Sequence, residues 1–464
     1  MTEDQILDLA AELNDYLAIG WPCLANRKSR AHLAGYARGL ISDLPRKSVE
    51  PMALAAGAAV RTLQEFLADY RWDHHRLKRI TQQRVIADHL PAPGCSSQDD
   101  LGVIGLIDET SSAKKGDKTP GVQRQYCGST GKIDNCIVTV HLAVRCGSFL
   151  AMLDSDLFLP QGAWHEDRAR CQAAHIPDNV VYRPKWKIAL DQIRDAIANG
   201  VRFDWLTFDE GYGGKPDFLR ELQTLGQDYV CEVPRNTQCW STYPRYRSPT
   251  NNYVAKSVEN VARYAPVFTC QKWKTVGLNR QTLAPQKWEV KSARVWMVQE
   301  GNADRPHLRR PTDRTFWLLA ARNCETGEMK YFLSNAPART KLMTLLKVAF
   351  SRWGVEHVFR LAKTEIGFEH YEGRTYQGLL RHLILCQWML LFVAEQTDKL
   401  RGEKIRIDDG ADGPSVKCDR PTLAQPTPWR SDSAHGQRDR LPPAPESCRQ
   451  TIPTVSFEQA MVAL

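Results

Sequence analysis

The sequence predicts an α/β protein with a mixed sheet, preceded by an all-α N-terminal domain and interrupted by a β-rich insertion. Apolar residues recur at helical spacing in segments near the start, such as ILDLAAEL and HLAGYARGLI. From Leu101 onward, strand-like runs such as GVIGLID and FDWLTFD alternate with helix-like segments, which is the pattern of an α/β domain. A chain of 464 residues with 42% hydrophobic residues can bury such a core in two or three domains.

Changes in composition divide the chain into five predicted segments. The linker PAPGCSSQDD is rich in turn formers and separates the helical start from the strand-containing part. An aromatic and basic stretch with few helical signals interrupts the α/β pattern, and Pro, Asp, Ser and Arg dominate the end of the chain. The segments are a helical domain (1–95), a first catalytic part (96–234), a β-rich insertion (235–313), a second catalytic part (314–400) and a Pro-rich, largely irregular tail (401–464).

The charge of the chain favours a polyanionic partner without requiring one. There are 62 Lys and Arg residues against 53 Asp and Glu, which gives a formal net charge of +9. Basic residues on the N-terminal helices could face phosphates, although helical surfaces are often basic without binding anything. Charge alone therefore leaves a nucleic-acid partner open.

Neither the N-terminus nor any internal stretch predicts export or a membrane span. The first residues, MTEDQILDLAAELNDYL, are acidic and lack the features of a signal peptide. The longest apolar stretch, residues 383–394, is too short to cross a bilayer core of about 30 Å as a helix. The 13 Cys form no CxxC pair, so neither a disulfide framework nor a zinc ribbon is predicted, and a cytoplasmic protein is expected.

Two Asp residues follow apolar strands. Asp108 ends the run GVIGLID, beside a basic loop that contains Lys114 and Lys115, and Asp209 ends the run WLTFD. The glycines after Asp209, in EGYGG, let the backbone turn sharply away from a crowded site. An Asp in this position often does no more than cap the next turn. Two carboxylates at strand ends are more suggestive than one.

A third carboxylate is predicted on a helix. Glu356 lies in RWGVEHVFRLAKTE, where apolar residues occupy much of the helix and the polar side also carries Arg352, Arg360 and Lys363. One interpretation is an ordinary ion pair on a surface helix. The other is that a carboxylate among three cations takes part in binding metal ions or phosphate groups.

Together, Asp108, Asp209 and Glu356 form the set of hard oxygen ligands that phosphodiester chemistry needs. Such a set can hold two Mg²⁺ ions about 4 Å apart, with Mn²⁺ able to substitute, one activating the attacking water or 3′-OH and the other stabilising the leaving oxygen. Zinc sites and Ser/His/Asp catalysis are less well supported, because the 12 His are scattered and no GxSxG occurs.

Several of these segments resemble the DDE transposases of bacterial insertion sequences. The matching stretches are GLIDET, QYCGSTGKIDNC, LFLP followed by WHEDRARCQAAHIP, TFDEGYGG and RWGVEHVFRLAKTEIGFEHYEGR. Each is weak alone, but together they are specific and cover roughly residues 15–395. The resemblance implies an RNase H-like fold, in the group with a β-strand insertion before the Glu, with Asp108, Asp209 and Glu356 as catalytic metal ligands.

The resemblance also implies residues that contact DNA. Arg352, Glu356 and Lys363 match the Tyr-Arg-Glu-Lys signature of that group, whereas Ala349 stands where its Tyr would be, a departure that bears on end processing more than on cutting. Arg352 and Lys363 are then expected to grip the DNA strand. Further candidates are Arg360, Lys114 and Lys115 and, for stacking on a flipped base, an insertion Trp among Trp240, Trp273, Trp288 and Trp296, although packing is more common for any one Trp.

The sequence thus predicts a transposase that acts on double-stranded DNA in the cytoplasm, at the nucleoid. It would bind terminal inverted repeats as a homodimer or higher oligomer, cut them and join the 3′-OH ends to target DNA. Two alternatives stay open: a transposase-derived DNA-binding or regulatory protein, and an RNase H-like nuclease that never joins strands. The intact acidic triad argues against the first, and joining of pre-cut ends would exclude the second.

Overall fold

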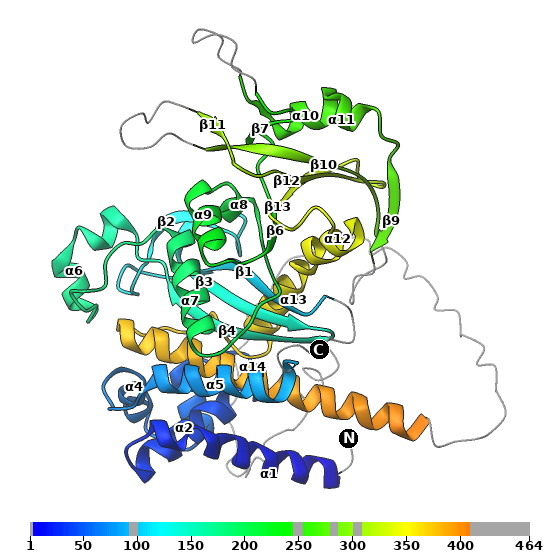
Figure 1. The fold of residues 1–464 in the computed structure, drawn as a ribbon. Helices are drawn as coiled ribbons and strands as arrows, with labels where there is room; N and C mark the ends of the chain where they lie inside the picture. Colours follow the sequence, from blue (N-terminus) through cyan, green and yellow to red (C-terminus); the bar gives the residue numbers. More distant parts are fainter. Residues whose placement is uncertain (1–2, 92–100, 245–253, 279–285, 300–308, 409–464) are drawn as a thin grey trace, which may run out of the picture.

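The structure is a computed structural model that describes residues 3–91, 101–244, 254–278, 286–299 and 309–408. The described strands form a 13-stranded mixed sheet with helices on both faces (Figure 1). The expected boundary near residue 95 and residues 409–464 of the expected tail lie outside the described residues, whereas residues 401–408, expected to begin the irregular tail, continue helix α14 (Tyr376–Asp408). Within the described residues, the mixed α/β fold predicted from the sequence is confirmed.

The N-terminal region is helical, as predicted. Side chains cap the free N–H groups at two of its helix starts, where Asn26 accepts from Ser29 and Asp73 accepts from Arg76. The helices are α1 (Glu3–Ile19), α2 (Arg27–Leu40), α3 (Val49–Ala55), α4 (Val60–Ala68) and α5 (His74–His89), with a 3₁₀ turn at Trp21–Cys23.

Four strands form the antiparallel half of the sheet. The longest is β3 (Lys132–Cys146), whose buried central residues pair with β1 (Val103–Ala113) on one side. On the other side β3 pairs with β2 (Gln123–Cys127) at its beginning and with β4 (Phe149–Leu157) at its end. Asp108 therefore lies on a strand that is anchored along its whole length by one neighbour.

The parallel half of the sheet lies on the other side of β1. There β1 runs parallel to β5 (Trp205–Phe208), which in turn runs parallel to β6 (Tyr229–Glu232). Parallel strands need crossover connections, and helices α7 (Lys185–Ala198) and α9 (Pro216–Thr224) provide them. Before α7 the chain forms a π-helical turn (Gln161–His165) and helix α6 (Arg168–Ala173).

The stretch predicted to be a β-rich insertion continues the same sheet and also contains two short helices. Its long strand β10 pairs with β12, and β13 pairs with β6, so the sheet runs without a break from the parallel half into this region. The elements of this stretch are β7 (Gln238–Trp240), β8 (Lys256–Ser257), α10 (Val258–Tyr264), α11 (Pro266–Thr269), β9 (Lys274–Leu278), β10 (Gln286–Gln299) and β11 (Arg310–Pro311). Strands β12 (Phe316–Asn323) and β13 (Met329–Ser334) follow it, in the predicted second catalytic part.

Alternate residues of β1 face two different cores. Leu106 packs into a cluster with α13 (Trp353–Thr364), α14 (Tyr376–Asp408) and the N-terminal helices, whereas Ile107 packs with α7 and α9. Figure 1 shows α7 and α9 in front of the sheet and α13 behind it. Asp108 follows the alternation of Leu106 and therefore faces α13.

Helix α14 joins the N-terminal helices to the rest of the protein. Arg381, only 1% exposed, donates to the carbonyl oxygens of Leu67 and Trp72 at 2.9 Å each, and its guanidinium lies 4.7 Å above the Trp72 ring. Part of α14, Tyr376–Lys399, is long and apolar enough to cross a membrane, but 83% of its apolar window is buried inside the protein. That burial is typical of a core helix.

Candidate active site

Asp108 lies in the middle of β1, which corrects the prediction that it ends the strand. β1 continues to Ala113, and Asp108 pairs with His141 of β3. On the other side, however, the register with β5 ends at the pair of Ile107 and Phe208. Asp108 thus lies directly after the last parallel pair of β1, level with the residue that follows β5.

Asp209 follows β5 directly and begins the short helix α8 (Glu210–Gly213). Its Oδ1 accepts hydrogen bonds from the backbone N–H groups of Gly211 at 3.0 Å and Tyr212 at 3.4 Å. A Cβ on Gly213 would lie 1.9 Å from the carbonyl oxygen of Glu232, so only glycine lets α8 pack this closely against β6. These contacts fix the Asp209 carboxylate at the end of the parallel half of the sheet.

Glu356 lies in the first turn of α13 with a side chain that is 59% exposed. Arg352 occupies the junction between α12 (Leu342–Ser351) and α13, and its guanidinium bridges two carboxylates. Its Nη1 lies 3.0 Å from Asp108 Oδ2, and its Nη2 lies 3.2 Å from Glu356 Oε1. The helix therefore brings a cation to Asp108 and a second carboxylate to that cation.

The charges of the three carboxylates also act on one another. Burial raises the pKa of Asp108 to about 7 although Arg352 lowers it, and the negative charges of Asp209 and Glu356 add to the increase. Burial acts to lower the pKa of Arg352, but the charges of Asp108, Glu356 and Asp209 outweigh it and raise this pKa. Three carboxylates thus share one cation, which leaves an excess of negative charge.

The donor set fits a divalent cation of the kind that DDE endonucleases use. Carboxylate oxygens are the ligands that Mg²⁺ and Mn²⁺ prefer in proteins. Among the described residues, no three His, Cys, Asp or Glu side chains are already arranged closely enough to hold a metal ion. The guanidinium of Arg352 lies between Asp108 and Glu356 and pairs with both.

Glu109 supports this site from the α7 face of the sheet and was not predicted from the sequence. Its Oε1 lies 2.5 Å from the ammonium of Lys185 on α7, and its Oε2 accepts a long hydrogen bond of 3.4 Å from the hydroxyl of Tyr212 on α8. Tyr212 is 3% exposed. Glu109 therefore ties β1 to the helix that Asp209 begins. The second carboxylate in GLIDET was the available signal.

The cations predicted to contact DNA are placed differently from one another. Arg360 is exposed on α13, where its Nη2 lies 2.8 Å from His357 Nδ1, and Lys363 forms an ion pair of 2.6 Å with Glu369. Lys115 is exposed in the loop after β1. Lys114, by contrast, turns inward and donates to the carbonyl oxygens of residues 369 and 371 at 2.8 Å each. Only part of the Lys114 ammonium is therefore left for another ligand.

Two Trp residues predicted to stack on a flipped base lie in the core instead. Trp240 is 7% exposed and Trp288 is 1% exposed, and the ring of Trp288 packs 5.0 Å from that of Phe350. Rings buried to this extent have no free face for a base in this structure. Trp273 and Trp296 are half-buried, the first beneath the cations of Lys291 and Arg322, the second 5.8 Å from the ring of Tyr243.

Ala349, which stands where the related group carries Tyr, is 5% exposed within α12. It belongs to the apolar core that also holds Phe350 and Val355. Its methyl group therefore packs in the interior.

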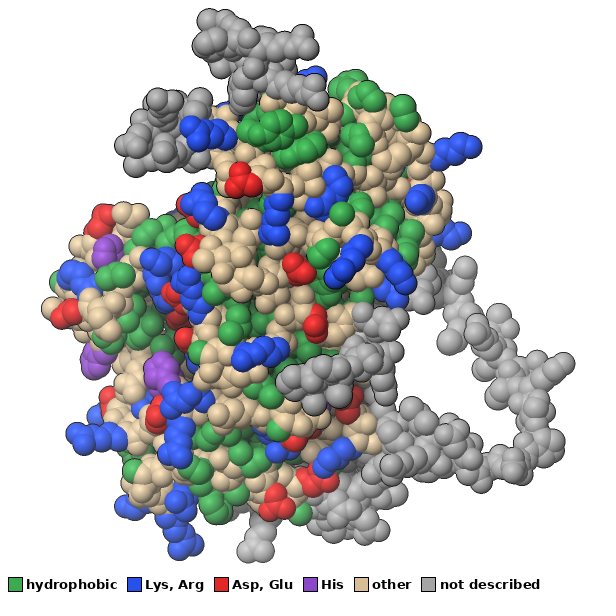
Figure 2. Space-filling model, in the orientation of Figure 1, with side chains coloured by type: hydrophobic (Ala, Val, Ile, Leu, Met, Phe, Trp, Pro, Cys, Tyr) green, Lys and Arg blue, Asp and Glu red, His purple; other side chains and the backbone are tan. Residues whose placement is uncertain are grey.

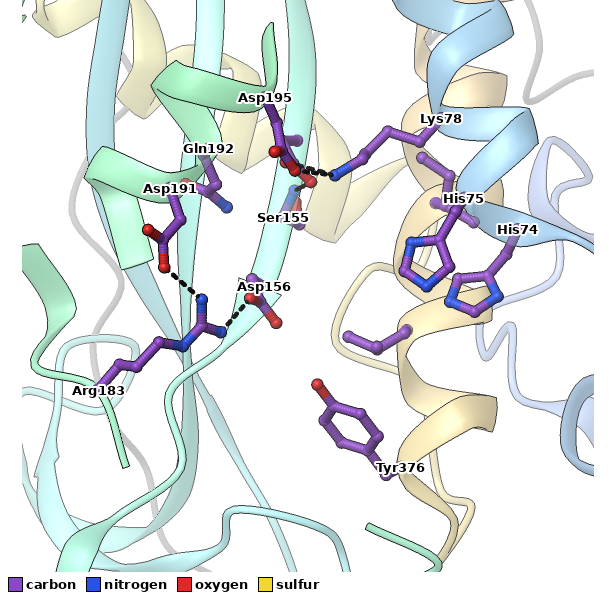
Figure 3. Close-up of a pocket in the computed structure, with 13 residues that line it drawn as sticks. His74, His75, Lys78, Ser155, Asp156, Arg183, Asp191, Gln192, Asp195 and Tyr376 are labelled. Carbon is purple, nitrogen blue, oxygen red and sulfur yellow. Dashed lines mark hydrogen bonds and ion pairs between the residues drawn. The ribbon is translucent and has the colours of Figure 1, made fainter. Parts of the chain in front are cut away.

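A second acidic cluster, the seam pocket, lies where α5, β4, α7 and α14 meet (Figure 3). The cavity is about 180 Å³. Lys78 Nζ lies 2.8 Å from Asp154 Oδ2 and 3.4 Å from Asp195 Oδ2. Burial raises the pKa of Asp154 to about 6, although Lys78 lowers it. Arg183 bridges two further carboxylates, Asp156 at 2.6 Å and Asp191 at 2.7 Å.

Comparisons with known proteins place the chain in a family. Residues 21–295, more than half of the chain, match the family described as DDE superfamily endonuclease, a range that includes Asp108 and Asp209 and ends before Glu356. The probable transposase for insertion sequence element IS701 from Microchaete diplosiphon is 32% identical over 202 residues, which are 43% of this chain and 47% of that protein. The chain thus spans about half the length of this relative.

Among solved structures, the NurA nuclease from Sulfolobus solfataricus matches at 10% identity over 72% of this chain and 92% of that chain. Its TM-score of 0.23 is too low to support an argument about fold or function. The family match does not depend on it. The chain belongs to the DDE superfamily of endonucleases.

Proposed function

We propose that the protein is a transposase that binds the terminal inverted repeats of an insertion sequence, cuts the DNA and joins the 3′-OH ends to target DNA. The observation that carries this proposal is the convergence of Asp108 and Glu356 on the guanidinium of Arg352, with the charge of Asp209 acting on the same carboxylate. The family of the chain and the relative described as a probable transposase support the same activity.

In this proposal Asp108, Asp209 and Glu356 are the metal ligands, and the ions are Mg²⁺ with Mn²⁺ as a substitute. Bound ions of this kind lower the pKa of the attacking water or 3′-OH and stabilise the leaving oxygen. The backbone N–H groups that bind Asp209 Oδ1 orient its carboxylate, and the pairing with β3 orients Asp108. The guanidinium of Arg352, released from the carboxylates, would contact a DNA phosphate.

The remaining contacts to DNA would be to its phosphates and would come from several parts of the protein. On the face in Figure 2, Lys and Arg side chains are spread from the N-terminal helices to the insertion and do not form a single strip. Arg360 and Lys363 on α13 would hold the strand beside the catalytic carboxylates, and the N-terminal helices would position the duplex. A homodimer or higher oligomer at the nucleoid would bring two ends together.

The substitution Glu356→Gln tests this proposal. It keeps the size of an exposed side chain but removes a charged metal ligand, so folding and DNA binding should be retained while Mg²⁺-dependent cleavage is lost. The substrate is a plasmid carrying the DNA termini that flank the coding sequence of the protein. Cleavage by purified Glu356→Gln at the wild-type rate would refute the site assignment.

A nuclease that hydrolyses DNA without joining it is distinguished by a second assay. Pre-cut termini with free 3′-OH ends are supplied together with a target plasmid and Mg²⁺. Covalently joined product is expected from the wild-type protein. Cleavage of intact termini without any joined product would favour the hydrolytic alternative.

A further inference from the structure

A pocket of about 470 Å³, here called the loop pocket, opens at the end of β1 that follows Asp108. Three segments that are far apart in sequence form it. They are the turn between α2 and α3, which carries Arg46, the loop after β1, which carries Lys114 and Lys115, and the connection between α13 and α14, from Glu369 to Glu372. The pocket therefore lies between the N-terminal helices and the sheet.

The loop pocket lies on the same face of the sheet as the catalytic carboxylates. Lys114 continues the pairing of β1 with β3, because its N–H donates to the carbonyl oxygen of Asn135 at 2.8 Å. Along this strand Lys114 shares the alternation of Asp108, so both side chains are on the α13 side. Glu369, which lines the pocket, pairs with Lys363 of the Glu356 helix at 2.6 Å. A strand that leaves the active site along α13 would reach this pocket.

The pocket is lined by hydrogen-bond donors. Lys115 and Arg46 are exposed cations at its rim. His370 Nδ1 accepts a hydrogen bond from the backbone N–H of Lys47 at 2.9 Å. Burial lowers the pKa of His370, and the positive charges of Lys47 and Arg46 lower it further. A neutral ring whose Nδ1 accepts must carry its proton on Nε2, so the free nitrogen of His370 is a donor.

The carboxylates of the pocket are already engaged by cations. Glu372 pairs with Arg46, and Glu369 pairs with Lys363. Burial lowers the pKa of Lys114 to about 8, although the charge of Glu369 raises it. Among the described residues, the hydrogen bonds of its ammonium go to two carbonyl oxygens and not to a carboxylate. A cation without a counter-charge in contact favours an anion in the space beside it.

We propose that the loop pocket binds a backbone phosphate of the DNA strand held at the active site. The inference rests on the proposed function. One bound phosphate would contact the N-terminal helices, the sheet and the segment that follows the Glu356 helix. Because such a contact does not depend on base sequence, it positions the strand and does not select it.

The matched variants Lys115→Ala and Lys187→Ala test the pocket by DNA binding, without any need for cleavage. Both remove one exposed lysine, but Lys187 lies on α7, on the opposite face of the sheet. Binding of two unrelated 30-base-pair duplexes is measured by fluorescence anisotropy over a range of salt concentrations in EDTA. Lys115→Ala should weaken binding by a similar factor for both duplexes and reduce the salt slope by about 1, while Lys187→Ala matches wild type.

Acetylation footprinting gives a readout within the wild-type protein. The duplex should protect Lys115 from acetylation several-fold and leave Lys187 unprotected, and inorganic phosphate at the same phosphate concentration should protect neither. Equal protection by inorganic phosphate would assign the pocket to free phosphate and overturn the proposal. Wild-type binding and salt slope for Lys115→Ala would overturn it too.

The outcomes separate the pocket from the proposed function. If the wild-type protein binds duplex through Lys115 but never cleaves or joins DNA, the loop pocket stands and the transposase proposal fails. If cleavage occurs and Lys115→Ala binds like wild type, only the pocket proposal fails.

Discussion

The protein contains two clusters of carboxylates that differ in whether every carboxylate has a cation in contact. In the seam pocket, Lys78 and Arg183 each bridge two Asp side chains, so every carboxylate of that cluster has a cation in contact (Figure 3). In the candidate active site, Arg352 bridges only Asp108 and Glu356. Among the described residues, Asp209 has no ion-pair partner and is held by backbone N–H groups.

The two clusters also differ in what they connect. The bridge from Lys78 to Asp154 links β4 to α5, whereas the bridge from Arg352 to Asp108 links the start of α13 to β1. A cluster in which every carboxylate contacts a cation holds elements together, but a cluster with a carboxylate that contacts no cation can still take up a metal ion. The difference indicates which acidic cluster carries the chemistry.

The largest expected effect is a loss of activity that occurs in one cluster and not in the other. Asp108→Asn removes a metal ligand and should lower the initial rate of DNA nicking by at least about a thousandfold, because a bound metal ion contributes several kcal/mol to such reactions. Asp154→Asn should stay within about threefold of wild type at a temperature where both variants are folded by circular dichroism. An equal loss in folded Asp154→Asn would reverse the assignment of the two clusters.

Substitutions in the seam pocket should change the stability of the fold, whereas substitutions in the active site should change the reaction rate. Lys78→Met leaves Asp154 and Asp195 without their shared cation, so urea denaturation should give a loss of about 3–5 kcal/mol in the free energy of unfolding. Lys187→Met on the exposed side of α7 is the control and should stay within about 0.5 kcal/mol of wild type. A loss below about 1 kcal/mol in Lys78→Met would show that the bridge is not structural.

The buried carboxyl of the seam pocket also predicts a dependence on pH. Burial raises the pKa of Asp154 from 3.8 to about 6, so its neutral form favours the fold; this contribution is present below about pH 4 and is lost as the pH rises through 6. The stability of wild type relative to Asp154→Asn should therefore fall by roughly 3 kcal/mol between pH 4 and pH 7. Unfolding curves of both proteins at each pH measure the difference in their free energies of unfolding. A difference that stays constant between pH 4 and pH 7 would contradict this prediction.

A smaller effect is expected when the cation of the active site is removed. In Arg352→Ala no guanidinium competes with a metal ion for Asp108 and Glu356. Mn²⁺ should therefore bind about tenfold more tightly, which is roughly 1.4 kcal/mol in binding free energy, and isothermal titration calorimetry measures this change. Lys363→Ala serves as a control, since Lys363 pairs with Glu369 and should leave Mn²⁺ affinity unchanged. Weaker Mn²⁺ binding by Arg352→Ala would mean that Arg352 supports the metal site and does not compete with it.

Local patterns in the sequence were sufficient to predict the fold class and to propose the three carboxylates. Apolar runs predict β1 and β5, and helical spacing predicts the side of α13 that packs inward. The end of β1 could not be predicted in the same way. Ser111 and Ser112 look like loop residues but are buried and paired with β3, because a strand ends where its neighbours stop pairing.

Residues whose environment depends on distant segments were also predicted poorly. Trp288 looks available in a basic, aromatic stretch, yet it packs against Phe350 of α12. Lys114 looks like part of a basic loop, yet its ammonium binds carbonyl oxygens more than 250 residues later in the chain. No local pattern contains such partners, so these contacts required the three-dimensional structure.

The most direct test of the central claim is to map where a divalent ion binds. Fe²⁺ is added to the wild-type protein with ascorbate, and the hydroxyl radicals formed at the ion cut the backbone next to its ligands, which mass spectrometry locates. Cuts are expected near residues 108, 209 and 356, and they should disappear with excess Mg²⁺ and in Asp108→Asn. Cuts that occur near residues 154 and 191 instead, in the seam pocket, would contradict the account.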